Sequence, residues 1–343
     1  MIKKILILLT VSIAFVSCQE KRDFLLTDYF PEIQVCKLQK MKEYPVDSIG
    51  HADFIFSHGD YLLLSEPKLD YLISLYNTTS KNFTRLLKKG ESPDQLLDVQ
   101  QIGRYKNEDS LLFVKSTFGK DIFTYTLGDD SLVFHKKIQM AGDNVSLFFD
   151  GDKTVVSQHG EKRFAVHDAQ EESAVEFGDS IVMGDCPQKL VSYILTGLCT
   201  GNKNLKRFVW ASIYGDIFEI YDYKNPLNVK TVASIRGILP MITVTQNQPV
   251  FSVESKLGIV SITATSQYIY MLYNENHIKD FLTQREDALL SDKILVYDWD
   301  GNPQKIIQTD KRLRSISCNE KLHKIYCLGV DNEGNAQIFF IRI

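Results

Sequence analysis

Short runs in which apolar and polar residues alternate recur along nearly the whole chain. They include 61–65, 111–115, 122–126, 207–212, 217–221, 268–273, 293–297 and 337–341. Aromatic and β-branched residues fill these runs, as a pleated and half-buried surface requires. Helical periodicity is confined to 277–290 and to a capped turn at 92–95. The pattern therefore predicts an all-β protein built of short strands.

Turn residues separate the runs at regular intervals. Asp-Gly, Gly-Asp and Asn-rich clusters at 128–130, 150–152, 300–302 and 332–335 supply the left-handed backbone positions of tight hairpins. Grouping the strands by fours gives a period of about 40–50 residues, which is typical of a radial propeller. The five complete units are 52–88, 98–140, 144–180, 190–236 and 257–309.

The end of the chain predicts how the ring closes. The last unit, 313–343, has room for three strands, and an unassigned strand at 32–38 lies upstream of the first unit. We expect that N-terminal strand to complete the last blade by pairing near 337–343, because an open ring leaves two unpaired sheet edges. The prediction is a six-bladed β-propeller of four-stranded antiparallel blades. Two stacked β-sandwiches also fit this spacing and stay open as an alternative.

The N-terminus has the pattern of a bacterial export signal. Lys3-Lys4 precede an apolar run over 5–16, and Ser17-Cys18 follow it. The run is shorter than the roughly 20 residues of a membrane-spanning helix. A cysteine at this place resembles a lipobox, which predicts removal of residues 1–17 and lipidation of Cys18. We expect a tether over 18–31 and the propeller over 32–343. An ordinary cleaved signal with a chance cysteine is the alternative.

The net charge and the export signal limit the kinds of partner that we expect. Removal of residues 1–17 takes away two lysines and changes the formal net charge from −4 to −6. No basic stripe is present to hold a phosphate backbone, so we expect no nucleic-acid partner. We expect a protein exported and lipid-anchored in the cell envelope, at the outer membrane, with the periplasmic or surface face left open.

Motifs for catalysis, metals and cofactors give little. There is no G-x-S-x-G elbow, no H-E-x-x-H and no C-x-x-C, and the seven histidines are scattered. Five cysteines follow Cys18, and small buried hydrophobes are the favoured interpretation for Cys36, Cys186, Cys199, Cys318 and Cys327. Asp298, Asp300 and Asn302 allow a calcium interpretation, although a hairpin turn explains them more simply. We therefore assign no catalytic residue, no metal site and no cofactor.

Three segments carry a family resemblance. They are Gly90-Glu91-Ser92-Pro93-Asp94-Gln95-Leu96, Tyr297-Asp298-Trp299-Asp300-Gly301-Asn302-Pro303, and Tyr214-Gly215-Asp216 with Glu219-Ile220-Tyr221-Asp222. With them the chain resembles, over 40–343, the six-bladed TolB-like propeller lipoproteins typical of Bacteroidetes. Ser92, Asp94 and Gln95 depart from the family's glycines and acid. The resemblance implies a fold and an envelope address, and no common reaction.

Three functions remain from the sequence, and the third of them is a sensory or assembly partner for a membrane complex. The first is a non-catalytic binding or scaffold module for a glycan, peptide or protein partner. The second is a propeller hydrolase or lyase with its site in the central funnel. Tyrosines near strand ends are candidate ligand contacts or packing residues: Tyr214, Tyr221, Tyr223, Tyr273 and Tyr297. A funnel lined by apolar or neutral groups favours the module, and a dense axial cluster of His, Asp, Glu or Arg favours the enzyme.

Overall fold

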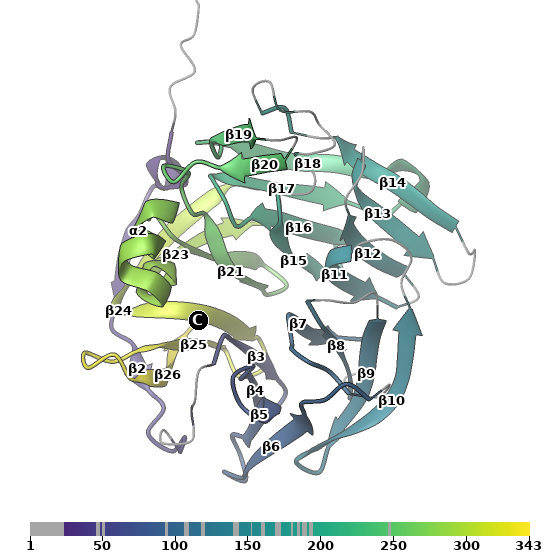
Figure 1. Ribbon diagram of the computed structural model, residues 1–343, viewed down its shortest axis with the longest axis vertical. Coiled ribbons are helices and arrows are strands. Elements are labelled where there is room, and N and C mark those ends of the chain that lie inside the picture. The colour runs from purple at the N-terminus through teal and green to yellow at the C-terminus, as the bar shows by residue number, and fades with distance from the viewer. Residues whose placement is uncertain are drawn as a thin grey trace, which may run out of the picture.

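The computed structural model describes residues 24–343 except 46–48, 50–51, 93–94, 106–109, 118–120, 140–143, 152, 159–161, 169–172, 180, 184–185, 187–190, 192–194 and 246–247. The strands form blades around a central axis (Figure 1). Four blades are separate four-stranded antiparallel sheets. Their strands fall inside the first four predicted units.

The bounds of these sixteen strands are as follows. Blade 1 has β3 (Phe54–His58), β4 (Tyr61–Ser65), β5 (Tyr71–Asn77) and β6 (Phe83–Lys88). Blade 2 has β7 (Gln101–Arg104), β8 (Leu111–Lys115), β9 (Asp121–Gly128) and β10 (Ser131–Gln139). Blade 3 has β11 (Asn144–Asp150), β12 (Lys153–Gln158), β13 (Lys162–Asp168) and β14 (Ser173–Asp179). Blade 4 has β15 (Gly197–Asn202), β16 (Arg207–Ser212), β17 (Ile217–Asp222) and β18 (Lys230–Arg236).

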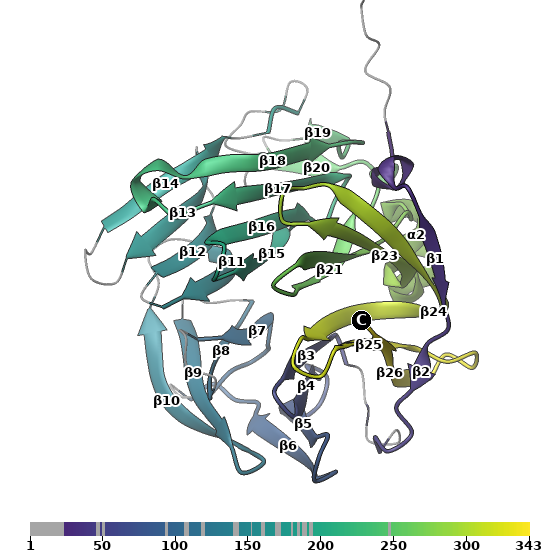
Figure 2. The same cartoon turned by 180° about the vertical axis from the view of Figure 1, so that it is seen from behind.

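The last two blades share one long strand. β24 (Pro303–Asn319) pairs mainly through its first half with β23 (Ser291–Asp298), which continues to β22 (Tyr268–Tyr273) and β21 (Ile259–Ala264). Its second half pairs with β25 (Lys324–Val330), which pairs with β26 (Ala336–Arg342). The shared strand makes one continuous sheet of blades 5 and 6, visible from behind in Figure 2. Together these sheets confirm the all-β propeller.

Ring closure by an N-terminal strand is confirmed, but the closing residues differ from those expected. β2 (Gln39–Lys40) pairs antiparallel with Phe340 and Phe339 of β26 and becomes the fourth strand of blade 6. β1 (Ile33–Cys36) instead lies parallel to residues 306–309 of β24, at the outer edge of blade 5. The expected pairing of 32–38 with 337–343 is therefore wrong by one blade. Alternation identified a strand at this place but contained no information about its neighbour.

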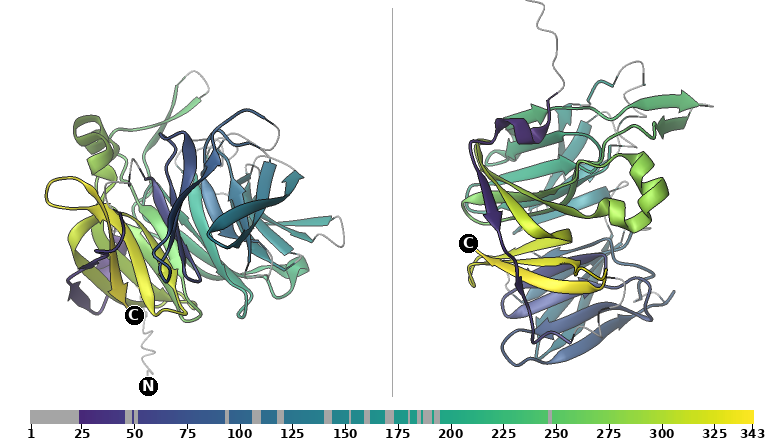
Figure 3. Two further views of the ribbon diagram at one scale, coloured as in Figure 1. Left: turned by 90° about the horizontal axis from the view of Figure 1, so that it is seen from below. Right: turned by 90° about the vertical axis from the view of Figure 1, so that its left-hand side faces the viewer.

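Several additions lie on one face of the ring. In an antiparallel blade, the starts of the first and third strands and the ends of the second and fourth share a face, which we call the connection face. The hairpin of β19 (Ile242–Thr245) and β20 (Gln248–Phe251) joins blade 4 to blade 5 there. α2 (Ile278–Gln284) and η4 (Arg285–Leu289) join β22 to β23 and confirm the predicted helical segment. The right panel of Figure 3 shows the hairpin and α2 projecting on the same side.

The other predicted helical turn, at 92–95, is no helix in its described residues. The Gln95 amide donates to the Ser92 carbonyl at 2.8 Å, which closes a turn between β6 and β7. Near the N-terminus, η1 (Leu26–Tyr29) is a single 3-10 turn. Within the described part of the chain, none of the helices is long and apolar enough to cross a bilayer.

The hydrophobic core lies between neighbouring blades. Between blades 3 and 4, Phe164 and Phe177 pack against Phe208 and Tyr221, with ring centroids 5.2–5.6 Å apart. Successive side chains of a strand point to opposite faces of its blade, so each strand contributes alternate residues to the clusters on the two sides. Edge-to-face packing of such rings contributes about 0.5–1.5 kcal/mol per pair beyond the burial of apolar area. The blades are thus held in a ring by side chains, because no main-chain ladder joins the first four among the described strands.

Candidate functional site

A cavity of about 640 Å³ lies on the propeller axis. It is lined by the first strand of every blade: β3, β7, β11, β15, β21 and the second half of β24. Small-molecule sites span roughly 300–1,000 Å³, so the cavity is large enough to hold a ligand. We call it the axial channel.

Hydroxyl side chains cover the free backbone edges on one side of the channel. The innermost strand of a blade has an unpaired edge toward the axis, which leaves amide groups in need of partners. Ser315 and Ser317 of β24 accept from the amides of Ile55 and Ser57 in blade 1, at 3.3 and 2.8 Å. These bonds join blade 6 to blade 1 without a sheet ladder.

The same arrangement joins blade 5 to blade 6. Ser261 and Thr263 of β21 accept from the amides of Ile316 and Cys318, at 3.1 and 2.9 Å. In each case the two acceptors are two residues apart and therefore point to the same side of their strand. Hydroxyl residues at alternate positions of an otherwise apolar strand were the sequence signal for these contacts, and it was missed.

Side-chain amides act in a similar way elsewhere in the ring. Gln101 of β7 donates to the carbonyl of Leu147 at 2.8 Å and accepts from its amide at 3.1 Å, which joins blades 2 and 3. Asn202, at the end of β15, donates to the Ser266 carbonyl at 2.8 Å and joins blades 4 and 5. These polar groups of the channel wall are engaged within the protein.

Aromatic rings form the apolar part of the wall. Phe54 and Phe56 of β3 and Phe148 of β11 line the channel and are only partly buried. Phe148 lies directly on Gly201 of β15, where a β-carbon would come within 2.3 Å of the ring. Glycine at this position therefore lets the ring pack against the neighbouring strand. The rings offer a ligand apolar contact inside a cavity with neutral polar walls.

Charged side chains of the channel lie at its ends. Asp53 directly precedes β3, Arg104 ends β7, Lys203 follows β15 and Glu320 follows β24. Between these ends, the described lining residues are apolar or carry hydroxyl, amide or thiol groups. A fully desolvated charge would therefore have no charged partner in the middle of the channel, at a cost of several kcal/mol.

Two thiols belong to the same wall. Burial raises the pKa of Cys199 to about 12, although a hydrogen-bond contact of 3.0 Å with Ser146 opposes the shift. Burial also raises the pKa of Cys318 well above its ordinary value. The thiolate is the nucleophilic form of cysteine, so these side chains act at neutral pH as small neutral groups.

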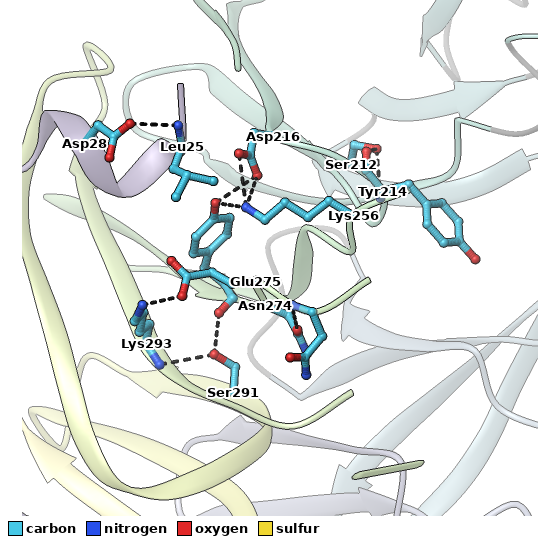
Figure 4. Close-up of polar contacts among 12 residues, drawn as sticks. Leu25, Asp28, Ser212, Tyr214, Asp216, Lys256, Asn274, Glu275, Ser291 and Lys293 are labelled. Carbon is cyan, nitrogen blue, oxygen red and sulfur yellow. Dashed lines mark hydrogen bonds and ion pairs between the residues drawn. The ribbon is translucent and has the colours of Figure 1, made fainter. Parts of the chain in front are cut away.

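A second polar cluster lies near the connection face (Figure 4). Lys256 contacts both carboxylate oxygens of Asp216, at 2.8 and 3.1 Å, and the Tyr273 hydroxyl donates to Asp216 at 2.9 Å. All three side chains are buried. Burial raises the pKa of Asp216 and lowers that of Lys256, and the contact between the two opposes both shifts. The buried backbone of Leu26 also bonds to Asp216, so the cluster joins blades 4 and 5 to the N-terminal segment.

A third cluster joins blades 3 and 4. Arg163 of β13 pairs with Glu219 of β17, and both are buried. Tyr221 and Arg236 donate to the same carboxylate at 2.6 and 2.8 Å. The Arg163 guanidinium also lies 4.9 Å from the ring centroid of Trp210, within the range of a cation–π contact. Burial alone would raise the pKa of Glu219, but Arg163, Tyr221 and Arg236 together hold that pKa below its usual value.

The candidate tyrosines pack inside the protein. Tyr221, Tyr223, Tyr273 and Tyr297 are at most 3% exposed. Tyr214 stacks against Phe251 with ring centroids 4.2 Å apart. The packing interpretation therefore holds for these rings. Cys18 lies outside the described residues, and its lipidation stays a prediction.

The Asp298 carboxylate is occupied by its own hairpin turn. It accepts from the amides of Asp300 and Asn302 at 2.9 and 2.8 Å and from the side chains of Asn302 and Gln304. Arg207 of blade 4 donates to Asp300 and to the Trp299 carbonyl at 2.7 and 2.8 Å. The hairpin interpretation of this segment is correct, and the turn also holds blade 5 against blade 4.

None of the five cysteines in the described part of the chain forms a disulfide. Cys318 and Cys327 lie diagonally across the β24–β25 pair, without a disulfide between them. Among the described residues, no group of three or more His, Cys, Asp or Glu side chains is placed to hold a metal ion.

The sequence matches a model of a known propeller family. A model of the TolB-like 6-blade propeller-like family matches residues 53–321. The chain belongs to this family. The match covers blades 1–5 and the first strand of blade 6, and it ends before β25 and β26.

Several solved structures are similar to the chain at low identity. A member of the DUF4221 family from Bacteroides vulgatus is 10% identical, covers 88% of this chain and 94% of its own, and superposes with a TM-score of 0.52. The Cps50 (Swd1) β-propeller domain of Myceliophthora thermophila is 10% identical over 86% of this chain and 98% of its own, with a TM-score of 0.47. The Pan2 WD40 domain of Neurospora crassa is 12% identical over 88% and 83%, with a TM-score of 0.48. No curated protein matches the sequence.

Proposed function

We propose that this TolB-like propeller is an envelope-anchored lipoprotein that acts as a non-catalytic binding or scaffold module for a glycan, peptide or protein partner. The observation that carries the proposal is the axial channel, which is large enough for a ligand and has apolar and neutral walls. Its charged residues lie at the ends of strands, where they can select what enters.

The channel wall suits binding because it is already rigid. Hydrogen bonds between the first strands fix Ser315, Ser317, Ser261 and Thr263 in place. A preformed site binds with little loss of side-chain freedom. Buried thiols with raised pKa supply no nucleophile at neutral pH.

A channel-blocking variant tests the binding part. Thr200 of β15 lines the channel, so Thr200→Phe fills it, whereas Thr231→Phe adds the same ring to the exposed outer strand of the same blade. Partners crosslinked to the parent protein in envelope membranes should be recovered with Thr231→Phe and lost with Thr200→Phe. Equal recovery with both folded variants would place the binding site elsewhere.

The rival function has its own measurement. Hydrolysis by the purified protein that disappears in Asp53→Asn or Glu320→Gln, with an unchanged melting temperature, would favour a propeller hydrolase or lyase. These two carboxylates are the acidic side chains among the described lining residues.

The anchor is tested at Cys18. The proposed lipoprotein incorporates labelled fatty acid and enters the detergent phase, because stable attachment requires more than one acyl chain. Cys18→Ser should abolish both. Unchanged partitioning and processing of this variant would contradict the anchor and leave the binding proposal standing.

A further inference from the structure

The hairpin of β19 and β20 projects from the connection face as a nearly isolated ribbon (Figure 3). It forms a two-stranded sheet of its own, whereas every other strand belongs to a blade or to its outer edge. The segment 237–253, which contains the hairpin, has no charged residue, although charged residues make up 24% of the chain.

Register and burial show which side of the ribbon faces outward. Ile242 lies opposite Phe251 and packs against the core between blades 3 and 4, while Phe251 stacks on Tyr214. The alternate positions point the other way, and they include Thr243, Thr245 and Gln248. Met241 and Val250 are therefore on the outer side, where they are 50% and 49% exposed.

The N-terminal segment reaches the base of the same hairpin. The carbonyl of Phe24 lies 2.5 Å from the position that a β-carbon of Gly237 would take, and Gly237 is four residues before Met241. Leu26 is fully buried beside Asp216, which fixes this end of the chain on the propeller. Figures 1 and 2 show η1 and the hairpin at the same part of the ring's circumference, and the right panel of Figure 3 shows that the hairpin projects to the side away from η1.

Chain length sets how far the proposed lipid can be from this rim. Phe24 is six positions after Cys18 in the chain. Even fully extended, that distance is roughly 20 Å at 3.3–3.6 Å per residue. An anchor at Cys18 therefore brings a bilayer surface within reach of the hairpin.

We propose that the outer side of the β19–β20 hairpin lies on the lipid bilayer that holds the Cys18 anchor. The inference rests on the lipidation proposed above. Apolar side chains without neighbouring charges enter the interface between headgroups and acyl chains at little cost, whereas a charged ribbon would have to be desolvated. Contact at this second point would orient the propeller relative to the membrane.

A pair of tryptophan variants tests the contact in the full mature lipoprotein. Val250→Trp places the probe on the outer side of the hairpin, and Val133→Trp places it on the outer strand of blade 2, where Val133 is 61% exposed. In vesicles containing phospholipids brominated on the acyl chains, the Val250→Trp signal should shift to the blue and be quenched. The signal of Val133→Trp should not change. The parent protein supplies the background of Trp210 and Trp299, which are buried.

The outcomes separate the two proposals. Failure of the parent to float with vesicles means that the anchor is absent, and the proposed lipidation falls. Flotation with an unquenched Val250→Trp means that the lipid anchor is present and that the proposed bilayer contact is wrong. The apolar hairpin would then be a candidate surface for a protein partner. Equal quenching at both positions would indicate non-specific adsorption and would also overturn the proposal.

Discussion

Glu219 shows how single residues hold neighbouring blades together. Its buried carboxylate receives Arg163 from blade 3 and Arg236 and Tyr221 from its own blade. The two arginines differ in exposure, since the Arg163 side chain is 4% exposed and that of Arg236 is 42% exposed. This difference allows buried and half-exposed ion pairs to be compared on one carboxylate.

We expect Arg163→Met to destabilise the protein much more than Arg236→Met. Removal of a buried partner costs about 3–5 kcal/mol, because a charge stays buried without compensation. The Arg236 side chain is 42% exposed, so solvent screens its pair with Glu219 and its removal should cost less. Urea unfolding of both variants measures the two losses. Equal losses of unfolding free energy in the two variants would contradict a larger contribution from the buried Arg163.

The same carboxylate predicts a dependence of stability on pH. The pKa of Glu219 is lowered in the folded protein, so its contribution is fully present above the unfolded value of about 4.3 and is lost as pH falls through the folded value. The difference in unfolding free energy between the parent and Glu219→Gln should be constant from pH 7 to about pH 5. It should then shrink below pH 4. A difference that grows on acidification would contradict the assignment.

Two turns with one sequence pattern offer a matched pair of glycines. Asp298–Gln304 and Asp331–Gln337 both follow D-x-[DE]-G-N-x-Q, and each aspartate accepts from the asparagine and glutamine of its turn. Gly301 and Gly334 both have φ of +87°. At Gly301 a β-carbon would lie 2.5 Å from the Ala233 side chain of blade 4, whereas at Gly334 it would meet nothing within 4 Å.

Alanine at the two glycines should therefore separate backbone strain from packing between blades. Gly334→Ala should cost about 1–2 kcal/mol for the left-handed backbone alone. Gly301→Ala should cost distinctly more, because blade 5 must move from blade 4. Melting temperatures of both variants measure the gap. Similar losses would show that the turn is able to shift away from Ala233 without cost.

At the scale of elements, the closing strand is the least predictable part of the fold. β2 has two residues, which is too short for any alternation to appear in the sequence. Deletion of 19–31 removes η1 and leaves β1 and β2 intact, whereas deletion of 19–41 removes all three. Both variants keep Cys18. The longer deletion also exposes the edge of β26.

We expect the longer deletion to lower the melting temperature sharply or to cause aggregation, because an exposed edge strand pairs with other chains. The shorter deletion should have a smaller effect, from loss of the contacts of Leu26 and Phe30 with blades 4 and 5. Thermal scans and light scattering measure both. If the two variants behave alike, β1 and β2 are not the strands that keep the ring closed.

Strands and hairpins were predictable because their signals are local. Alternation in 268–273 and the turn at Asp298–Asn302 each involve residues a few positions apart. The pairing of Lys256 with Asp216 and that of Arg163 with Glu219 span 40 and 56 residues. Nothing in a single sequence marks such partners. The motifs around Tyr214 and Glu219 were noticed, but their role in joining blades required the structure.

At the scale of the whole molecule, the propeller combines two kinds of joint. Blades 5 and 6 share β24, while the joints between the other blades are made mainly by side chains and by bonds from a side chain to a backbone, with backbone bonds between residues 213–215 and 256–258 joining blade 4 to blade 5. The channel wall is made by these joints, so its shape depends on residues from all six blades. The sequence left open whether charged groups cluster in the funnel, and it could not show which strand residues line it.

Closure by β2 also determines when the protein can finish folding. Gln39 pairs with Phe340, its partner near the end of the chain. Synthesis at about 5–20 residues per second separates the appearance of these two strands by roughly 15–60 s. β2 thus remains unpaired until the residues of β26 have been made, so the ring cannot close before the strands of all six blades are present.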